Sequence, residues 1–508
     1  MIYLSANNDL AEESIFALTE MRKVGSSENV TVVAQFDSHS YKNLPLLIDR
    51  NETAGTIMKK LGQAKANQPT PSPGASRGGK QPKPPSYADE IYEFVKYCTQ
   101  EYPAPRTMLV LSGHAGGIAY DLLRRASGDM TDSLTMIDLG QLIERIHRRL
   151  KTHIDILGLD TCLMSMAEVA YMVHNHAKVM IGSEGFEPVA GWPYQIVLKE
   201  VETFAQTNGG GTDDQVKELA RRIVCGYIQY YTDYQAAALS VDQSACDLGR
   251  TVGLMKALKV FSNTLLGYMN GHKDREAARN ALVLAHWEAQ PYKNEQYVDL
   301  YDFCERLRHY CPASLTDIHQ ACQNIMNVIR GSANEPDSST AASAFQNVDP
   351  FVLQSCYSGL TVQYSYGASI YFPWAKDPAR LDNYKKLYMA QDSDWKDFLE
   401  AYLTVTQRAK RPGRPSPIGG KFTKRQTRRL FDVIGNELLF GSDHRDGGHT
   451  RDGGHTRDGG HTRDLANVVG SMRNPPTDFD DCPDCPPAAY EDRGSEPKPK
   501  GRRTVRKA

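Results

Sequence analysis

Short apolar runs that alternate with helical patterns are the feature that most constrains the fold of this sequence. Five runs rich in Val, Ile, Leu and Phe have the length and composition of strands, namely residues 1–4, 30–37, 107–112, 154–160 and 178–182. Between two of them, the segment 132–150 has apolar residues at spacings of three and four, which indicates a helix with one buried face. Alternating strands and helices predict a parallel sheet covered on both sides, and nearly continuous apolar strands are typical of a sheet buried on both faces. The predicted class is therefore α/β.

Composition divides the chain into one domain and a tail. We expect a folded domain over residues 1–406, interrupted by a mobile Pro-, Gly-, Ser- and Lys-rich loop at 64–86. Residues 407–508 become basic and Pro-rich and contain three RDGGHT repeats, which predicts a low-complexity, largely disordered tail. A short apolar run at 430–441 is compatible with docking of the tail on an unknown protein partner. Within the domain we also expect helices at 10–23, 87–99, 163–173 and 395–403, a strand at 236–242, a mostly helical region over 245–335 and a hairpin at 359–373.

Bulk composition excludes several classes of protein. A hydrophobic content of 40% with 24% charged residues is ordinary for a globular domain, and a formal net charge of −2 gives no overall attraction to nucleic acid. No run reaches the roughly 18 apolar residues that a membrane span needs. The first residues lack a basic start followed by a long apolar stretch, so we expect a cytoplasmic protein, secreted only if the true N-terminus is missing. The ten cysteines are scattered, which favours reduced core residues over a disulfide framework.

The segment LVLSGHAGG, residues 109–117, ends a predicted strand with a histidine among glycines. The next predicted strand, 154–160, is followed almost at once by Cys162, and a helix lies between the two strands. That order is one βαβ crossover, so the two strands are expected to be parallel and adjacent. His114 and Cys162 are then expected at the carboxyl edge of the sheet, where open α/β sheets bind ligands.

A thiol and an imidazole at one edge favour nucleophilic catalysis. The imidazole serves as a base for the thiol and then protonates a leaving amine. Cys162 is expected at the start of a helix, which favours the thiolate. The N–H groups of Ala115 and Cys162 are candidates for holding an oxyanion. Taken singly, His114 is also compatible with an ordinary loop residue and Cys162 with core packing.

These segments resemble the histidine and cysteine blocks of the clostripain family of cysteine peptidases, which belong to the caspase-like group. The resemblance rests on SGHAGG and LGLDTCLMSMAEVAY, and it continues in the family's order through IYLSANNDL, GSEGFEPVAGWPY, LSVDQS, YVDLYDFC, GASIYFPW and DSDWKDFLEAYL. It covers about residues 1–405 and none of the tail. It implies a caspase-like α/β/α sandwich with a mostly parallel central sheet. It also implies an endopeptidase that cleaves peptides and proteins after arginine, less often after lysine.

The resemblance assigns roles to individual residues. Cys162 is expected to be the nucleophile and His114 the general acid and base. Asp160 is expected in the pocket that receives the basic side chain of the substrate, where a carboxylate pairs with a guanidinium. Trp192 is expected as a wall of that pocket. A helix cap at Asp160 and a core position for Trp192 are the alternatives.

Two departures from the family's pattern affect these expectations. Ala115 stands where the family usually has glycine, which keeps the backbone donor and restricts the turn. Val189 and Ala190 stand where some relatives carry a second acid, so selectivity for arginine is expected to rest on the first one. Glu184 and Glu187 are weaker candidates for the missing acid.

Two further properties are implied by the resemblance alone. Relatives often cut themselves between the histidine and cysteine blocks, so self-cleavage is expected in the polar loop 122–133 at Arg124-Arg125, after Arg125 first. Some members need calcium, but no acidic loop of EF-hand spacing occurs here, so calcium is expected from the family only. No other cofactor is implied.

Several other signals are given less weight. Cys482 and Cys485 supply half the ligands of a zinc site, and His449, His455 and His461 belong to the repeats, so we expect no metal site. Two alternatives remain for the whole chain, a catalytically silent binding or scaffold protein on the same fold and a peptide ligase or transpeptidase. Hydrolysis of a peptide amide that is lost in Cys162→Ala separates turnover from binding, and product analysis with an added amine separates hydrolysis from ligation.

Overall fold

An eight-stranded sheet organises the chain, as a computed structural model shows for residues 1–38, 44–66, 86–119, 122–123, 133–208, 211–234, 240–271, 273–293, 295–331 and 349–407. The strand order is β10-β7-β6-β5-β4-β1-β2-β3. The five strands from β6 to β2 in this order are parallel, whereas β3, β7 and β10 run antiparallel to their neighbours. The strands are β1 (Ile2–Ser5), β2 (Val33–Asp37), β3 (Pro45–Leu47), β4 (Met108–Ser112), β5 (Ile154–Asp160), β6 (Ala177–Gly182), β7 (Val241–Asp247) and β10 (Val352–Ser358).

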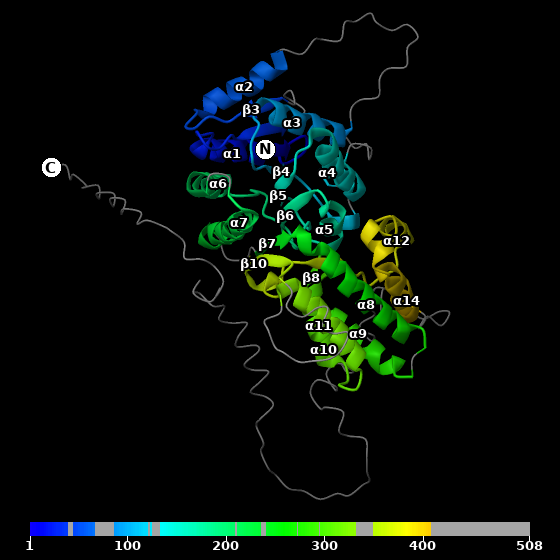
Figure 1. Cartoon of the computed structure of the whole chain (residues 1–508). Helices are drawn as coiled ribbons and strands as arrows, with labels where there is room; N and C mark the ends of the chain where they lie inside the picture. The colour runs from blue at the N-terminus through cyan, green and yellow to red at the C-terminus, as the bar shows by residue number, and fades with distance from the viewer. Residues whose placement is uncertain are drawn as a thin grey trace, which may run out of the picture.

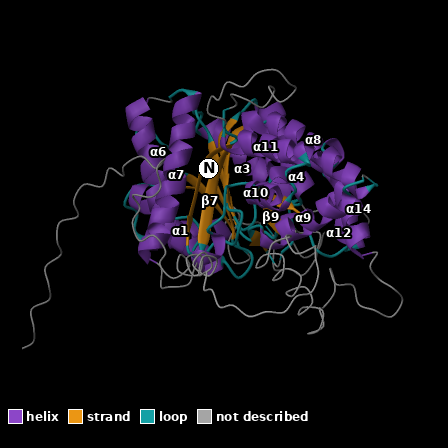
Figure 2. Cartoon of the chain, turned by 90° about the horizontal axis from the view of Figure 1, so that it is seen from below, coloured by secondary structure: helices purple, strands orange, loops and turns teal. Residues whose placement is uncertain are grey.

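Helices cover both faces of this sheet because alternate side chains of the strands point to opposite sides. In β4, Val110 packs with the cluster under α1, α6 and α7, while Leu109 and Leu111 pack with the cluster under α3, α4 and α5. Figure 2 shows the strands between these two helical layers. The helices are α1 (Ala11–Val24), α2 (Ala54–Ala66), α3 (Tyr87–Glu101), α4 (Met136–Leu150), α5 (Ala167–Val173), α6 (Tyr194–Asn208) and α7 (Asp213–Tyr234).

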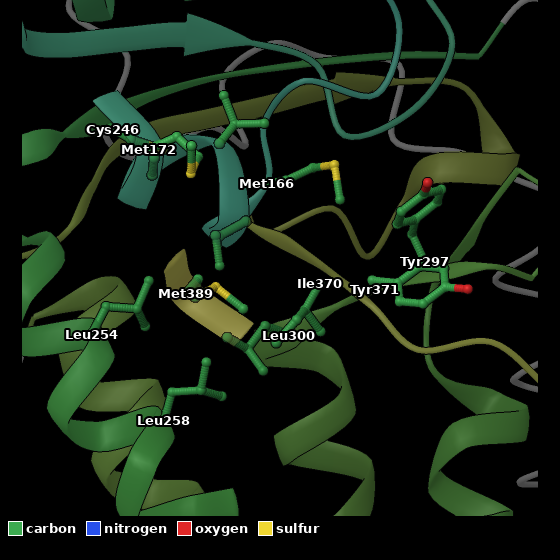
Figure 3. Packing of buried hydrophobic residues seen from close by; sticks show 14 of the residues in the cluster. Met166, Met172, Cys246, Leu254, Leu258, Tyr297, Leu300, Ile370, Tyr371 and Met389 are labelled. Carbon is green, nitrogen blue, oxygen red and sulfur yellow. The ribbon is translucent and has the colours of Figure 1, made fainter. Parts of the chain in front are cut away.

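The second half of the chain adds a helical region and a small sheet beside β7 and β10 (Figure 1). The small antiparallel sheet has the order β11-β9-β8 and joins the first half through Ser369, whose N–H donates to the carbonyl of Ser165. Figure 3 shows the apolar contact between the two halves, where Met166, Leu300 and Ile370 lie together. The elements are α8 (Thr251–Met269), α9 (Arg275–Glu288), β8 (Pro291–Tyr292), β9 (Tyr297–Asp299), α10 (Leu300–Tyr310), α11 (Thr316–Arg330), β11 (Ser369–Tyr371), α12 (Pro378–Tyr384), α13 (Tyr388–Asp392) and α14 (Trp395–Gln407), with single 3-10 turns η1 (Gly117–Ala119), η2 (Leu248–Arg250) and η4 (Leu360–Val362).

Most predictions for the first 182 residues are confirmed. All five apolar runs contain strands, and they form the parallel part of the sheet in an α/β fold. Helices α3 and α4 begin after capping boxes, in which Ser86 pairs with Asp89 and Thr135 with Asp138. The final helix, α14, also begins at the predicted residue, Trp395.

The predicted mostly helical region over 245–335 is confirmed, with the β8–β9 hairpin between α9 and α10. Two local predictions are wrong. The segment 359–373 is not a hairpin, because β11 pairs with β9 and η4 intervenes after β10. The helix after Cys162 begins only at Ala167, because a turn with Leu163 in the left-handed region comes first. The expected mobile loop lies mostly outside the described residues, and so do the RDGGHT repeats of the tail and its cysteines and histidines.

In the ranges that the structure describes, no helix combines the length and the apolar character that crossing a bilayer requires.

Candidate active site

The strands β4 and β5 deliver His114 and Cys162 to the same edge of the sheet. They pair in parallel with Ser112 opposite Asp160, and the N–H of Gly113 continues the ladder by donating to the carbonyl of Asp160 at 3.1 Å. His114 and Cys162 therefore each lie two residues beyond a paired position. The predicted adjacency of the two strands is confirmed, and the two candidate side chains leave neighbouring strand ends.

The turn that carries His114 needs glycine before and after the histidine in the chain. A Cβ on Gly113 would lie 2.9 Å from side-chain atoms of Ser5 and Leu123, and a Cβ on Gly117 (φ +68°) would lie 2.5 Å from the hydroxyl of Tyr297. The side chain of His114 is 46% exposed, and its Nε2 lies 2.7 Å from Oδ1 of Asp9. The imidazole is thus open to solvent and held from one side by a carboxylate.

The cysteine turn is held by the loop that follows β6. Leu163 is buried with φ +61°, a conformation that costs a β-carbon residue energy and that clusters at functional sites. Its N–H donates to the carbonyl of Gly185 at 2.9 Å. The sulfur of Cys162 accepts the N–H of Glu187 at 3.3 Å. The loop carrying Glu187 therefore sets the position of the thiol.

The pKa of the Cys162 thiol is raised in the substrate-free protein, so the thiol holds its proton more tightly than an exposed thiol does. Burial raises the pKa of the Cys162 thiol, the negative charge of Asp160 raises it further, and the N–H of Glu187 lowers it. The expected help from a helix N-terminus is absent because α5 begins five residues later. Among the described residues the thiol and the imidazole are not hydrogen-bonded to each other, so a base must remove this proton when substrate is in place.

Two backbone donors are predicted to hold an oxyanion. In the described part of the chain, the N–H groups of Ala115 and Cys162 make no hydrogen bond to another residue. An oxyanion requires donors that are not already engaged elsewhere.

Asp160 is a buried acid directly beneath Cys162. Its side chain accepts the N–H of Trp192 at 3.0 Å and the hydroxyl of Tyr194 at 2.6 Å. Burial raises the pKa of Asp160, although these hydrogen bonds oppose the shift. The alternative of a cap for the following helix is wrong, because the N-cap of α5 is Met166 and has no side-chain cap.

Trp192 lies in the core, with its side chain only 2% exposed. A Cβ on Gly158 would lie 2.9 Å from the indole ring, so that glycine in β5 makes room for it. The indole N–H donates to Oε1 of Glu187 at 3.3 Å. The tryptophan thus packs on the sheet with one face while its polar edge is directed to an acid beside the thiol.

The two weaker acidic candidates, Glu187 and Glu184, have different surroundings in the structure. The Glu187 side chain is part-buried near Asp160 and Cys162, and burial followed by the charge of Asp160 raises the pKa of Glu187 well above its ordinary value. Glu184 is fully buried, and its carboxylate accepts the N–H of Gly367 at 2.7 Å. Glu187 therefore remains the candidate for the acid missing at Val189 and Ala190, whereas the carboxylate of Glu184 is sealed in the core.

Two charged residues near the site were not predicted. Asp9 contacts His114, and Lys293 at the β8–β9 turn donates to the carbonyl of Gly116. Burial lowers the pKa of Lys293 to about 8, and the neighbouring charges of Arg380 and Cys162 act on it in opposite directions. The ANND turn after the first apolar run was a usable signal for Asp9, since β1 adjoins β4. Lys293 had none, because its hairpin was not expected.

The remaining candidates give no further site. Arg124 and Arg125 lie outside the described residues. In the described ranges, no group of three or more His, Cys, Asp or Glu side chains is arranged to hold a metal ion.

Comparisons with known proteins show the family and the fold of the chain. A family model described as the clostripain family matches residues 2–402. Clostripain from Hathewaya histolytica is 23% identical over 346 residues, which are 60% of this chain and 65% of that protein, so the match spans just under two thirds of that relative's length. An X-ray structure of a secreted C11 cysteine protease from Bacteroides thetaiotaomicron, in complex with an irreversible peptide inhibitor, has a TM-score of 0.51 at 15% identity and covers 78% of this chain and 98% of that one. At this identity the likeness concerns the fold, and a secreted neighbour gives no support to the expected cytoplasmic location.

Proposed function

The chain belongs to the clostripain family of cysteine peptidases, and from that premise we propose that it is an endopeptidase that cleaves peptides and proteins after basic residues, arginine before lysine. The observation that carries the proposal is the end of the β4–β5 pair, where an imidazole and a thiol leave adjacent strands above two carboxyl groups. A scaffold protein has no need for this combination of an exposed imidazole, a left-handed turn at Leu163 and free backbone donors.

Acylation begins with proton transfer. Because burial raises the pKa of the Cys162 thiol, the thiol needs a base, and His114 takes its proton as the sulfur attacks the carbonyl carbon before the scissile bond. The C=O bond becomes a C–O⁻ bond, and the N–H groups of Ala115 and Cys162 bind the oxyanion. When the C–N bond breaks, His114 gives its proton to the leaving amine, and a thioester remains on Cys162.

Deacylation repeats these steps with water. His114 takes a proton from a water molecule, whose oxygen attacks the thioester carbonyl. The C–S bond then breaks, the sulfur recovers its proton from the imidazolium, and the product leaves as a carboxylic acid. Both halves use the same two backbone donors.

The acids Asp160 and Glu187 account for selectivity. Two carboxyl groups close together under the thiol cannot both ionise cheaply, and a substrate cation removes that cost. A guanidinium reaches two acceptors at once through its planar fork, whereas an ammonium presents a single point of charge. Arginine is therefore preferred over lysine.

A fluorogenic peptide amide ending in arginine tests the function. The protein is expected to release the fluorophore, and Cys162→Ala is expected to lose this activity completely. Cys225→Ala is the matched control, because Cys225 is a partly exposed cysteine on α7 away from the site. Binding of the peptide without turnover by the unaltered protein would favour the scaffold alternative.

Self-processing belongs to the same proposal. Mass spectrometry of the purified chain is expected to find a cut after Arg125, and Cys162→Ala is expected to stay intact. Two fragments from Cys162→Ala would show that another protease makes the cut.

A further inference from the structure

Three neighbouring parallel strands, not two, carry chemically active side chains to the edge described above. β1 pairs with β4 with Leu4 opposite Ser112, and β4 pairs with β5 with Ser112 opposite Asp160. Asp9 follows β1 as His114 follows β4 and Cys162 follows β5. A carboxylate, an imidazole and a thiol therefore stand in a row across three strand ends.

The carboxylate of Asp9 contacts the imidazole of His114 directly. Oδ1 of Asp9 lies 2.7 Å from Nε2 of His114, and the hydrogen bond from His114 lowers the pKa of Asp9. The backbone on both sides of Asp9 is fixed: the N–H of Ala6 donates to the carbonyl of Asp37 at 2.8 Å, and the N–H of Leu10 donates to the side chain of Asn8 at 2.9 Å. The aspartate is thus presented from a defined turn.

Asp9 has no evident role in the adjoining helix. The N-cap of α1 is Leu10, without a side-chain cap hydrogen bond, so the carboxylate of Asp9 is not used there. Its side chain is 82% exposed. An exposed ion pair contributes little to folding stability, so a structural reason for this contact is weak.

We propose that Asp9 is the positioning residue for His114 in the peptidase reaction, an inference that rests on the proposed function. By accepting the Nε2–H, Asp9 fixes the tautomer and ring orientation, which leaves Nδ1 as the nitrogen that exchanges protons with the thiol and the leaving amine. The carboxylate also stabilises the imidazolium that forms during acylation. This stabilisation grows when a bound peptide excludes water from the pair. The site then works with three side chains instead of two.

Kinetics of Asp9→Asn, Asp9→Ala and Asp9→Glu on the arginine amide test the proposal. We expect kcat to fall about 10-fold or more in Asp9→Asn and Asp9→Ala with KM within about 2-fold, and to recover in large part in Asp9→Glu. Glu12→Gln in the first turn of α1 removes the same charge without touching His114 and is expected to match the unaltered protein.

A second readout does not depend on turnover. In protein labelled with ¹⁵N at histidine and carrying Cys162→Ala, NMR is expected to find His114 as the Nε2–H tautomer. This preference is expected to weaken once Asp9→Asn is added. A variant His114→Asn identifies the signal. Unchanged kcat and an unchanged tautomer in Asp9→Asn would overturn the proposal. If the unaltered protein cleaves no arginine amide, the proposed function fails, and the NMR measurement still decides whether Asp9 holds the imidazole.

Discussion

Two acids, Glu187 and Glu168, share a pKa that burial raises, and they differ in what surrounds them. Glu187 lies part-buried beside the thiol of Cys162, with Asp160 as its nearest acid. Glu168 lies on α5 with 1% of the residue exposed, and its Oε1 accepts the N–H of Tyr371 and the hydroxyl of Tyr384. Burial raises the pKa of both carboxyl groups. A raised pKa alone therefore does not identify a site, whereas proximity to a nucleophile does.

The strongest test compares the removal of an acid at the site, Asp160, with the removal of the sealed acid, Glu168. Asp160→Asn is expected to lower kcat/KM for an arginine amide by about 100-fold or more, because the substrate cation then meets one acid instead of two. Glu168→Gln is the matched change at the sealed acid and is expected to leave kcat/KM within about 2-fold. Steady-state kinetics at neutral pH compare the two, with circular dichroism to verify folding. Equal losses in both variants would remove the distinction between the two acids.

The preference for arginine over lysine tests the role of Glu187. Glu187→Gln keeps the size of the side chain and is expected to reduce the ratio of kcat/KM for arginine over lysine by about 10-fold, since the second acceptor for a guanidinium is weakened. Paired arginine and lysine amides measure the ratio directly. Were the ratio to stay the same while both rates fell, Glu187 would position the thiol through its backbone instead of selecting the substrate.

The pH dependence of KM distinguishes Glu187 from Glu168. The pKa of Glu187 is raised, and a bound cation favours its ionised form, so KM for an arginine amide is expected to fall as pH rises through that pKa. The dependence should weaken in Glu187→Gln and persist in Glu168→Gln. A KM profile in Glu187→Gln that is as steep as that of the unaltered protein would assign the titration to another group.

The pH dependence of folding stability is expected to reflect the titration of Glu168, the acid sealed in the core. Burial raises the pKa of Glu168 from 4.5 to about 7, so the folded protein holds a proton that the unfolded chain has already lost in this interval. The group contributes stability that is present below about pH 4.5 and lost as pH rises through about 7, up to about 3 kcal/mol in total. Urea unfolding across this range is expected to show a decline that becomes shallower in Glu168→Gln. Identical slopes in both proteins would contradict a protonated Glu168.

Much of the fold could be predicted because its signals are local. The apolar runs specify a parallel sheet, and the βαβ order around 107–160 fixes the adjacency that brings His114 and Cys162 together. The β8–β9 hairpin could not be predicted, since its strands are two and three residues long and β9 pairs with β11 far along the chain. The late start of α5 depends on a left-handed turn at Leu163, for which the sequence gives no signal.

The site was predictable to the same extent. His114, Cys162 and Asp160 follow from strand ends and the family resemblance. The positions of Glu187 and Asp9 depend on how loops fold back over the edge, through contacts such as Glu187 N–H to sulfur that span distant segments. Sequence patterns carry strand order well and loop conformation poorly.

Covalent labelling tests the central claim most directly. The protein is treated with peptidyl acyloxymethyl ketones that end in arginine, lysine or norleucine, and the adduct is located by mass spectrometry. The account predicts one adduct, on Cys162, formed fastest with arginine, slower with lysine and hardly at all with norleucine, and abolished in His114→Ala. Equal labelling by all three compounds, or an adduct on Cys225 in place of Cys162, would contradict it.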